Sequence, residues 1–471
     1  MNIDNLTITK AHKGLKNKDF SCQELIKEFF KKIKKKEPDI NSFINLFKDK
    51  ALKQAEKKDQ KSYKYKSFLD GIPFIIKDNI LVKGNLCTAG SKMLKDYKAS
   101  YNASVVEKLK KAGAIILGKG NMDEFACGSS GETSFFGPTK NPLNEKKVPG
   151  GSSSGPAAAL ASHFVLGGLG SDTGGSIREP ASFCGVYGLK PSYNRVSRFG
   201  LIAMASSLDQ IGPMALSIDD LGIILSYIQD KDKKDLTSLK SDPIDLPIEP
   251  LKFKQITLGV CKNFPIKNKK QKKIFENTIS KLKNKGIKFV ELSLDYIKYA
   301  LEAYYILMPA EISSNLARYD GIKYGFRKES KDLLDIYKKT RSQGFGGEVK
   351  TRIMLGSFIL SHGYYDKYYT QAQKIRSLIK KEFQKAFSKG IDGLILPTTP
   401  GPAFSLKEKT KKPLDMYLSD IYTVPANLAG LPALTMPNGQ INDLPLGLQV
   451  IGDYFEDEKI LKIAKTIKKI I

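Results

Sequence analysis

The sequence has few of the side chains that build metal sites, disulfide frameworks and imidazole-based active sites. Its histidines are His12, His163 and His362, and its five cysteines are widely spaced, with no Cys-x-x-Cys pair. An odd number of scattered cysteines argues against a disulfide framework and against a zinc site. We therefore expect no metal in this chain and a reducing, cytoplasmic environment.

Long apolar runs are missing as well. No stretch approaches the ~20 consecutive apolar residues of a membrane-spanning helix, and residues 1–19 lack the apolar core of a signal peptide. A composition of 41% hydrophobic and 27% charged residues excludes an intrinsically disordered chain. The length of 471 residues exceeds the usual ~250–300 residues of a single core, so length alone predicts two domains.

Arginine is scarce, and this changes the interpretation of the net charge of +28. Only eight of the 77 basic residues are arginine, although arginine is the residue best suited to forked recognition of phosphates and bases. An excess made almost entirely of lysine is typical of coding bias rather than of a nucleic-acid-binding surface. The alternative is a weak, salt-sensitive contact with RNA.

The patterning that is present indicates an α/β fold. Ser21 is placed to cap a helix in the polar N-terminal region, because apolar residues recur after it at helical spacing. Short apolar runs bounded by turn residues alternate with helical segments further along, which favours a mixed or parallel sheet. The predicted strands are 71–78, 114–117, 393–396 and 447–451, and the predicted helices include 104–111, 265–286, part of 291–335, and 456–470.

One segment of this lysine-rich chain contains no lysine. Between Val148 and Leu189, Gly, Ser and Ala crowd together instead. Such a composition indicates close backbone approach and burial, which leave no room for long solvated side chains. This segment is therefore the first place to search for a functional motif.

A near match to a phosphate-binding P-loop lies at residues 113–120, Gly-Ala-Ile-Ile-Leu-Gly-Lys-Gly. The last position is Gly120, which has no hydroxyl for a magnesium ion, and the four middle residues are apolar. We therefore assign this segment to a strand and not to a nucleotide site.

A formal match to the nucleophile elbow lies at residues 151–155, Gly-Ser-Ser-Ser-Gly, and would make Ser153 the nucleophile. That mechanism needs a histidine later in the chain. His163 is too close in sequence to lie across a sheet, which leaves His362. The elbow is kept as an alternative.

Lys77, Ser152 and Ser176 form a candidate hydrolase site without histidine. A neutral lysine can accept a proton from a serine hydroxyl, and burial lowers the pKa of a lysine because the charged form loses its hydration. Lys77 ends an apolar strand, where such burial is expected, and Ser176 follows two glycines, which let several N–H groups converge as an oxyanion hole requires. Spacing alone leaves a second interpretation, in which these are glycine-rich turns and a buried lysine.

The motifs around these residues resemble the amidase signature family. Residues 150–159, Gly-Gly-Ser-Ser-Ser-Gly-Pro-Ala-Ala-Ala, and residues 170–180, Gly-Ser-Asp-Thr-Gly-Gly-Ser-Ile-Arg-Glu-Pro, are similar to its signature, and the intervals of 75 and 24 residues match its Ser-Ser-Lys triad. The resemblance covers essentially the whole chain. It implies the following site residues: Lys77, Ser152 and Ser176 as catalytic groups, and the N–H groups of Thr173, Gly174, Gly175 and Ser176 as the oxyanion hole.

Further stretches are similar to the glutaminase subunits of tRNA-dependent amidotransferases within this family. They include residues 71–79, 121–126, 311–321, 352–356 and 425–432. By this resemblance the chain hydrolyses glutamine, and its complex acts as an ATP-dependent carbon–nitrogen ligase that amidates misacylated Glu-tRNA(Gln). Amidation of Asp-tRNA(Asn) as well depends on the partner subunits, which select the tRNA.

The same resemblance implies a fold and partners. The fold would be an α/β/α arrangement of layers around a long mixed β-sheet, as a single domain over 1–471. Its parts would be an N-terminal helical region at 1–60, a catalytic core at 60–225, a surface linker at 230–254 and the rest of the core with the substrate clamp at 255–471. The amidotransferase B and C subunits would complete a heterotrimer, with ATP and magnesium used by the B subunit and no cofactor in this chain.

Free glutamine has two charged ends that such a site has to bind. The resemblance makes Arg352 the bidentate partner of the α-carboxylate and Asp420 the partner of the α-ammonium, with Tyr304 or Tyr305 completing the clamp. The alternative is that Arg352 and Asp420 are ordinary surface charges.

Two departures from the family and two rival classes complete the sequence-based hypothesis. Gly120 replaces a usual Thr, and Cys127 replaces a usual Met in a loop predicted to border the site, which would change pocket shape but not the triad. A stand-alone amidase would keep the triad and lack the amino-acid clamp. A non-catalytic RNA-binding or scaffold protein would need neither.

Overall fold

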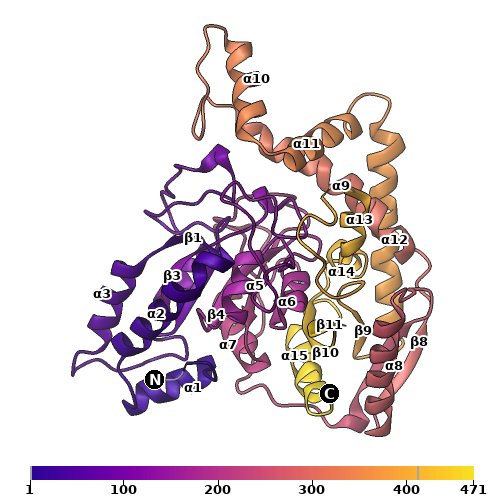
Figure 1. The fold of residues 1–471 in the computed structure, drawn as a ribbon. Helices are drawn as coiled ribbons and strands as arrows, with labels where there is room; N and C mark the ends of the chain where they lie inside the picture. Colours follow the sequence, from indigo (N-terminus) through magenta and orange to yellow (C-terminus); the bar gives the residue numbers. More distant parts are fainter. Residues whose placement is uncertain (1–2, 411–412) are drawn as a thin grey trace.

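A mixed β-sheet runs through the centre of the molecule (Figure 1). The computed structural model describes residues 3–410 and 413–471, and within them eleven strands form one sheet in the order β1-β3-β2-β4-β6-β5-β10-β11-β9-β7-β8. The strands are β1 (Phe43–Leu46), β2 (Pro73–Lys77), β3 (Ile115–Gly120), β4 (Gly167–Asp172), β5 (Tyr187–Lys190), β6 (Gln210–Ala215), β7 (Thr257–Cys261), β8 (Lys288–Leu292), β9 (Gly393–Pro397), β10 (Ala433–Ile441) and β11 (Leu444–Ile451).

Parallel and antiparallel pairs both occur in this sheet. β2 pairs in parallel with β3 and β4, and β7 pairs in parallel with β8 and β9, whereas the strands between these two groups are antiparallel. The predicted α/β class and mixed sheet are confirmed.

The helices of the described residues follow the chain order below. They are α1 (Ile8–Asn17), α2 (Cys22–Ile40), α3 (Lys48–Lys58), α4 (Ser104–Lys111), α5 (Ser154–Ala161), α6 (Arg178–Cys184), α7 (Ile218–Ile228), α8 (Lys269–Asn284), α9 (Ala300–Asn315), α10 (Leu333–Gly344), α11 (Gly347–Ile359), α12 (Thr370–Phe387), α13 (Pro413–Tyr417), α14 (Val424–Ala429) and α15 (Asp457–Lys468). Short turns include the π-helical η6 (Tyr365–Tyr369) and the 3-10 helix η7 (Leu418–Asp420).

Local signals explain several of these elements. Ser21 caps α2 as predicted: its hydroxyl accepts from Glu24 N at 3.1 Å, and the Glu24 carboxylate accepts from Ser21 N at 2.7 Å. The structure also departs from the pattern in two places. β1 is a strand in a region predicted to be helical, and the helix within 291–335 covers only α9. β1 is short and forms the edge of the sheet, where pairing with β3 stabilises a strand that periodicity does not predict.

β4 shows how helices cover both faces of the sheet. A Cβ on Gly167 would lie 2.6 Å from the Phe74 ring and 3.2 Å from Ile224 in α7, whereas a Cβ on Gly170 would lie 2.8 Å from the Ser153 hydroxyl beside α5. Residues 167 and 170 point to opposite faces because side chains alternate along a strand. The lysine-free segment is therefore glycine-rich because α5 and its preceding loop press directly on the strand.

Helices α9 to α12 extend beyond the sheet, and α10 projects furthest from the body (Figure 1). None of the helices in the described part of the chain combines the length and the apolar character that crossing a membrane needs.

Candidate active site

Lys77 lies at the carboxyl end of β2 and is completely buried. Its Nζ lies 2.7 Å from Ser152 Oγ, 2.9 Å from Ser171 Oγ and 3.2 Å from the Ser171 carbonyl oxygen. β2 lies between β3 and β4, so the whole strand is enclosed and the amine has no access to bulk water. The structure thus brings two of the three predicted catalytic side chains into hydrogen-bond contact.

Burial lowers the pKa of Lys77 to about 7, because the charged amine loses its hydration. The carboxylates of Asp123, Asp172 and Asp209 oppose this shift. The outcome is an amine that is substantially neutral near pH 7 and can accept a proton there.

Ser152 and Ser176 differ in exposure. Ser152 is completely buried and follows a cis peptide bond from Gly151, whereas Ser176 is 9% exposed. The described residues show no hydrogen bond between the two hydroxyls, but the loops that carry them are joined, since Ser153 N donates to the Ser176 carbonyl oxygen at 3.1 Å. Ser176 is the member of the predicted triad that remains within reach of a substrate.

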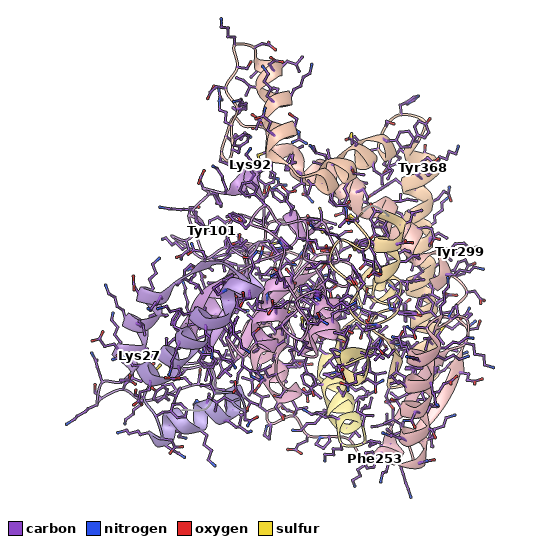
Figure 2. All side chains as sticks on the ribbon, viewed as in Figure 1. Lys27, Lys92, Tyr101, Phe253, Tyr299 and Tyr368 are labelled. Carbon is purple, nitrogen blue, oxygen red and sulfur yellow. The ribbon has the colours of Figure 1, made fainter. Side chains whose placement is uncertain are left out.

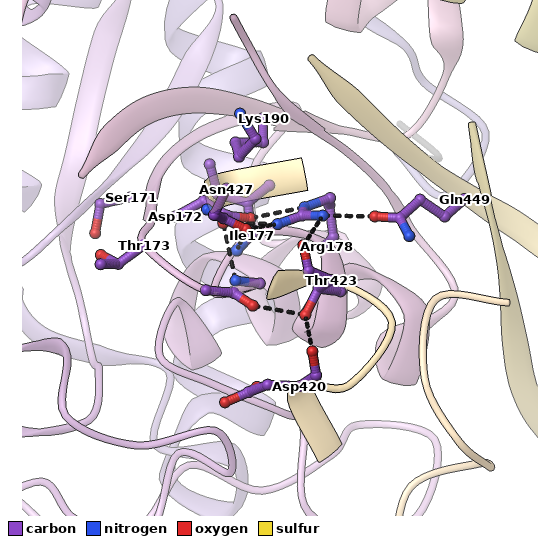
Figure 3. Close-up of polar contacts among 12 residues, drawn as sticks. Ser171, Asp172, Thr173, Ile177, Arg178, Lys190, Asp420, Thr423, Asn427 and Gln449 are labelled. Carbon is purple, nitrogen blue, oxygen red and sulfur yellow. Dashed lines mark hydrogen bonds and ion pairs between the residues drawn. The ribbon is translucent and has the colours of Figure 1, made fainter. Parts of the chain in front are cut away.

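Asp172, the last residue of β4, organises the loop that contains Ser176 (Figure 3). Its carboxylate accepts from Gly175 N at 2.9 Å and from Ile177 N at 3.1 Å, and it forms a two-point ion pair with Arg178 at 3.0 Å for each contact. Burial would raise the pKa of Asp172, but the Arg178 guanidinium outweighs it and lowers the pKa to about 2. The loop is therefore held by a fully buried ion pair with hydrogen-bonded oxygens.

Arg178 extends this network to the C-terminal part of the chain. It donates to the Thr423 carbonyl oxygen at 3.0 Å and to the side chains of Asn427 and Gln449 (Figure 3). Thr423 in turn donates from its hydroxyl to the Gly174 carbonyl oxygen at 2.6 Å. Segments more than 200 residues apart thus hold one loop in place.

The four amides predicted for the oxyanion hole are not equivalent. The Gly175 N–H already donates to Asp172, so it does not face an empty site as predicted. Gly175 has φ +142°, and a Cβ there would lie 2.4 Å from the Thr423 hydroxyl, which explains the glycine. Thr173 is fixed through its own hydroxyl, which donates to Asp209 at 2.7 Å. Thr173, Gly174 and Ser176 remain as candidate donors.

Arg352 in α11 is buried, at 3% exposed, and is not a surface charge. Its Nε donates to Glu348 at 2.7 Å, and its guanidinium lies 5.8 Å from the ring centres of Tyr305 and Tyr417, which stack on each other at 4.0 Å. Stacked aromatic faces and one carboxylate stabilise the charge while leaving guanidinium donors for a further partner.

Asp420 in η7 is also buried. Its oxygens accept from the Ser129 hydroxyl at 3.0 and 3.1 Å and from the Tyr305 hydroxyl at 2.8 Å. Burial raises its pKa to about 6, although these hydroxyls and Arg352 favour the charged form. Asp420 is therefore ionised at neutral pH and able to bind an ammonium group.

The two predicted tyrosines have different positions. Tyr305 contacts both clamp residues, through its hydroxyl to Asp420 and its ring to Arg352. Tyr304 packs against the Ser176 loop instead, since a Cβ on Gly174 would lie 2.6 Å from the Tyr304 hydroxyl.

The rejected motifs also have structural explanations. The Ser153 hydroxyl is buried and donates to the Ser171 carbonyl oxygen at 3.2 Å, while His362 is exposed beyond α11. The near P-loop is β3, where buried Lys119 lies 3.5 Å from Asp78. Cys127 is buried close enough to Arg352 to feel its charge, and burial raises the pKa of the thiol to about 12.

Sequence reasoning missed several residues that shape the site. Asp172 and Arg178 lie within the signature-like motif, but their pairing has no local signal. Glu179, next to them, is fully buried, and burial together with nearby Asp420 raises its pKa. Tyr417 carries no sequence signal either, because only the fold brings it onto Arg352.

A family model for amidases matches residues 24–461, and the chain belongs to the amidase signature family. Among its relatives, the A subunit of glutamyl-tRNA(Gln) amidotransferase from Sulfurihydrogenibium sp. (strain YO3AOP1) is 49% identical over 457 residues, covering 96% of this chain and 94% of the relative. The A subunit from Thermoanaerobacter pseudethanolicus is 50% identical over 470 residues, covering 98% and 96%.

Solved structures agree with this family assignment. The crystal structure of the glutamyl-tRNA(Gln) amidotransferase A subunit from Thermotoga maritima has a TM-score of 0.83 and 38% identity, covering 100% of this chain and 95% of that one. The peptide amidase of Stenotrophomonas maltophilia has a TM-score of 0.86 and 26% identity, covering 99% and 97%. The fold is thus shared with enzymes of different substrates.

Proposed function

We propose that this chain is the glutaminase subunit of a tRNA-dependent amidotransferase and releases ammonia for the amidation of Glu-tRNA(Gln). The observation that carries this function is the pairing, in one chain, of a hydrogen-bonded lysine and serine with two buried charges of opposite sign, Arg352 and Asp420. The first pair suits amide hydrolysis, and the second suits a free amino acid. The identity of about one half to two relatives named as A subunits of glutamyl-tRNA(Gln) amidotransferase supports the same function.

The proposed reaction begins with proton transfer. Neutral Lys77 accepts a proton from Ser152, which accepts one from Ser176, and the Ser176 oxygen attacks the carboxamide carbon of glutamine. The oxyanion accepts hydrogen bonds from the N–H groups of Thr173, Gly174 and Ser176, each worth ~3–4 kcal/mol of barrier. The proton returns through Ser152 to the leaving ammonia, and water then hydrolyses the glutamyl ester on Ser176.

Substrate recognition follows from the buried charges. Arg352 binds the α-carboxylate and Asp420 the α-ammonium, with Tyr305 holding both side chains in position. A stand-alone amidase for simple amides has no use for two buried, oppositely charged groups, because each costs desolvation energy that only a charged substrate offsets.

The ammonia is consumed elsewhere in the proposed complex. The B subunit activates the misacylated tRNA with ATP and magnesium, and the C subunit completes the heterotrimer. The complex works in the cytoplasm, where the five unpaired, buried cysteines stay reduced.

The test is co-expression of this chain with the B and C subunits from the same genome. We expect a stable complex that converts Glu-tRNA(Gln) with glutamine and ATP, and stoichiometric labelling of Ser176 by a serine-directed acylating reagent. Hydrolysis of simple amides without partners, together with no gain for glutamine, would favour the stand-alone amidase. Absence of Ser176 labelling would favour a non-catalytic protein.

A further inference from the structure

α11 carries apolar residues on two sides. Its inner side holds Val349, Arg352, Gly356 and Ile359, all buried. A Cβ on Gly356 would lie 1.9 Å from the Pro309 carbonyl oxygen in α9, so the two helices touch along this side. The inner side is therefore part of the protein core, and it also presents the proposed clamp residue Arg352.

The outer side of α11 and the turn that follows it expose large apolar side chains to solvent. Their exposed fractions range from 38% to 65%, and together we call them the α11 stripe: Met354, Leu355, Phe358, Tyr364 and Tyr365. The Phe358 and Tyr364 rings lie 4.2 Å apart, and Tyr364 stacks on Tyr368 at 6.0 Å, at the upper right in Figure 2. The stripe is thus a continuous apolar and aromatic surface.

Charge is missing from this surface. The thirteen residues 353–365 contain no Asp, Glu, Lys or Arg, although 27% of the chain is charged. An exposed helix face normally alternates apolar with charged positions. A charge-free surface with Met and aromatic residues has the composition of the centre of a protein–protein interface.

The surroundings of the stripe indicate what covers it. Residues 322–369 contain ten Lys and Arg but only five Asp and Glu, and the whole chain has a net charge of +28. A second copy of this chain would bring two basic rims together, which costs electrostatic energy. RNA would find no cation within the stripe to neutralise phosphates. The matching occupant is a protein with an apolar centre and an acidic rim.

We propose that the α11 stripe is the surface on which another subunit of the amidotransferase docks, and that docking strengthens glutamine binding through Arg352. This inference rests on the proposed function. A protein seated on the outer side restrains α11, and α11 carries Arg352 and its ion-pair partner Glu348 on the opposite side. Restraint of the helix therefore preorganises the clamp.

The experiment compares Met354→Asp, Phe358→Asp and their double variant with Leu236→Asp, a control on a leucine that is 95% exposed and far from the stripe in sequence. Each full chain is co-expressed with the B and C subunits, and assembly is measured by size-exclusion chromatography with light scattering. We expect each stripe variant to weaken assembly by about tenfold or more, and the control to assemble as the wild type does. Melting temperature and partner-free glutamine hydrolysis should be unchanged in every variant.

The kinetic arm tests the link to Arg352. Adding the B and C subunits should lower KM for glutamine in the wild type and in Leu236→Asp, but not in the stripe variants at the same subunit concentrations. Normal assembly of the stripe variants would overturn the docking surface. Normal KM in all assembled forms would overturn the coupling to the clamp.

Two further outcomes separate this inference from its basis. A wild-type chain that dimerises alone, with monomeric stripe variants, would assign the surface to a second copy and overturn the proposal. A wild-type chain that does not assemble with the other two subunits at all would overturn the proposed function. Assembly of wild type and stripe variants alike would overturn the docking surface and leave the proposed function intact.

Discussion

At the scale of single residues, the proposed chemistry depends on the protonation of one buried amine. Because burial lowers the pKa of Lys77 to about 7, its neutral form increases as pH rises through that value. We expect kcat/KM for glutamine to increase between about pH 6 and 8 and to level off above that range. Measurement of the pH profile of the assembled enzyme checks this.

Replacement of Lys77 tests whether the amine acts as a base. Lys77→Ala and Lys77→Arg should both lower kcat by about 10²–10⁴-fold, because arginine stays protonated and cannot accept a proton. Circular dichroism controls for the fold. Near-normal turnover of Lys77→Arg would mean that only the positive charge matters.

Ser176 and Ser153 separate two mechanisms. Ser176→Ala should abolish glutamine hydrolysis and acylation, because it removes the attacking oxygen. Ser153→Ala removes only a hydroxyl that donates to the Ser171 carbonyl oxygen, so it should retain activity. The opposite pattern in a glutaminase assay would favour the elbow mechanism.

The clamp residues should act only on substrates with charged ends. Arg352→Ala removes a charge-assisted contact worth ~1.5–3 kcal/mol, which is roughly a ten- to hundredfold loss in kcat/KM for glutamine. An analogue without the α-carboxylate should be almost unaffected, and Asp420→Asn should spare an analogue without the α-amino group. Equal losses on all substrates would show that these residues are structural.

At the scale of elements, the loop between β4 and α6 depends on the Asp172–Arg178 pair. Asp172→Asn leaves a buried guanidinium without its counter-charge, so we expect a loss of ~3–5 kcal/mol in the free energy of unfolding. It also weakens the contacts to Gly175 N and Ile177 N, so kcat should fall with it. Urea unfolding and kinetics check both effects.

The control for this loop is Asp443→Asn, at an exposed turn between β10 and β11. It should change neither stability nor turnover. A stable, active Asp172→Asn enzyme would show that the loop keeps its shape without the ion pair.

At the scale of the whole molecule, the net charge of +28 should have little role in tRNA selection. With eight arginines among 77 basic residues, we expect the isolated chain to bind tRNA weakly, with an affinity that falls steeply as salt rises. Filter binding over a salt series measures this. Tight binding that is selective for tRNA(Gln) at physiological salt would contradict the coding-bias interpretation.

The catalytic motif and much of the α/β pattern could be predicted because both are local. Ser152 and Ser176 lie in one lysine-free segment, and β2 and α4 follow from apolar runs and turn residues. β1 could not be predicted in this way, because its pairing with β3 and not its own propensity makes it a strand.

The sequence by itself determined the family, the fold class and the candidate catalytic residues, because these depend on short motifs at set spacing. The tertiary structure alone decided that Lys77 is enclosed beside Ser152, that the Gly175 amide belongs to Asp172, and that Arg352 lies on the stacked rings of Tyr305 and Tyr417. The physical reason is that desolvation and hydrogen bonding depend on neighbours far apart in the chain. The same holds for the α11 stripe, whose lack of charge is visible in the sequence but whose exposure exists only once α9 covers the other side of the helix.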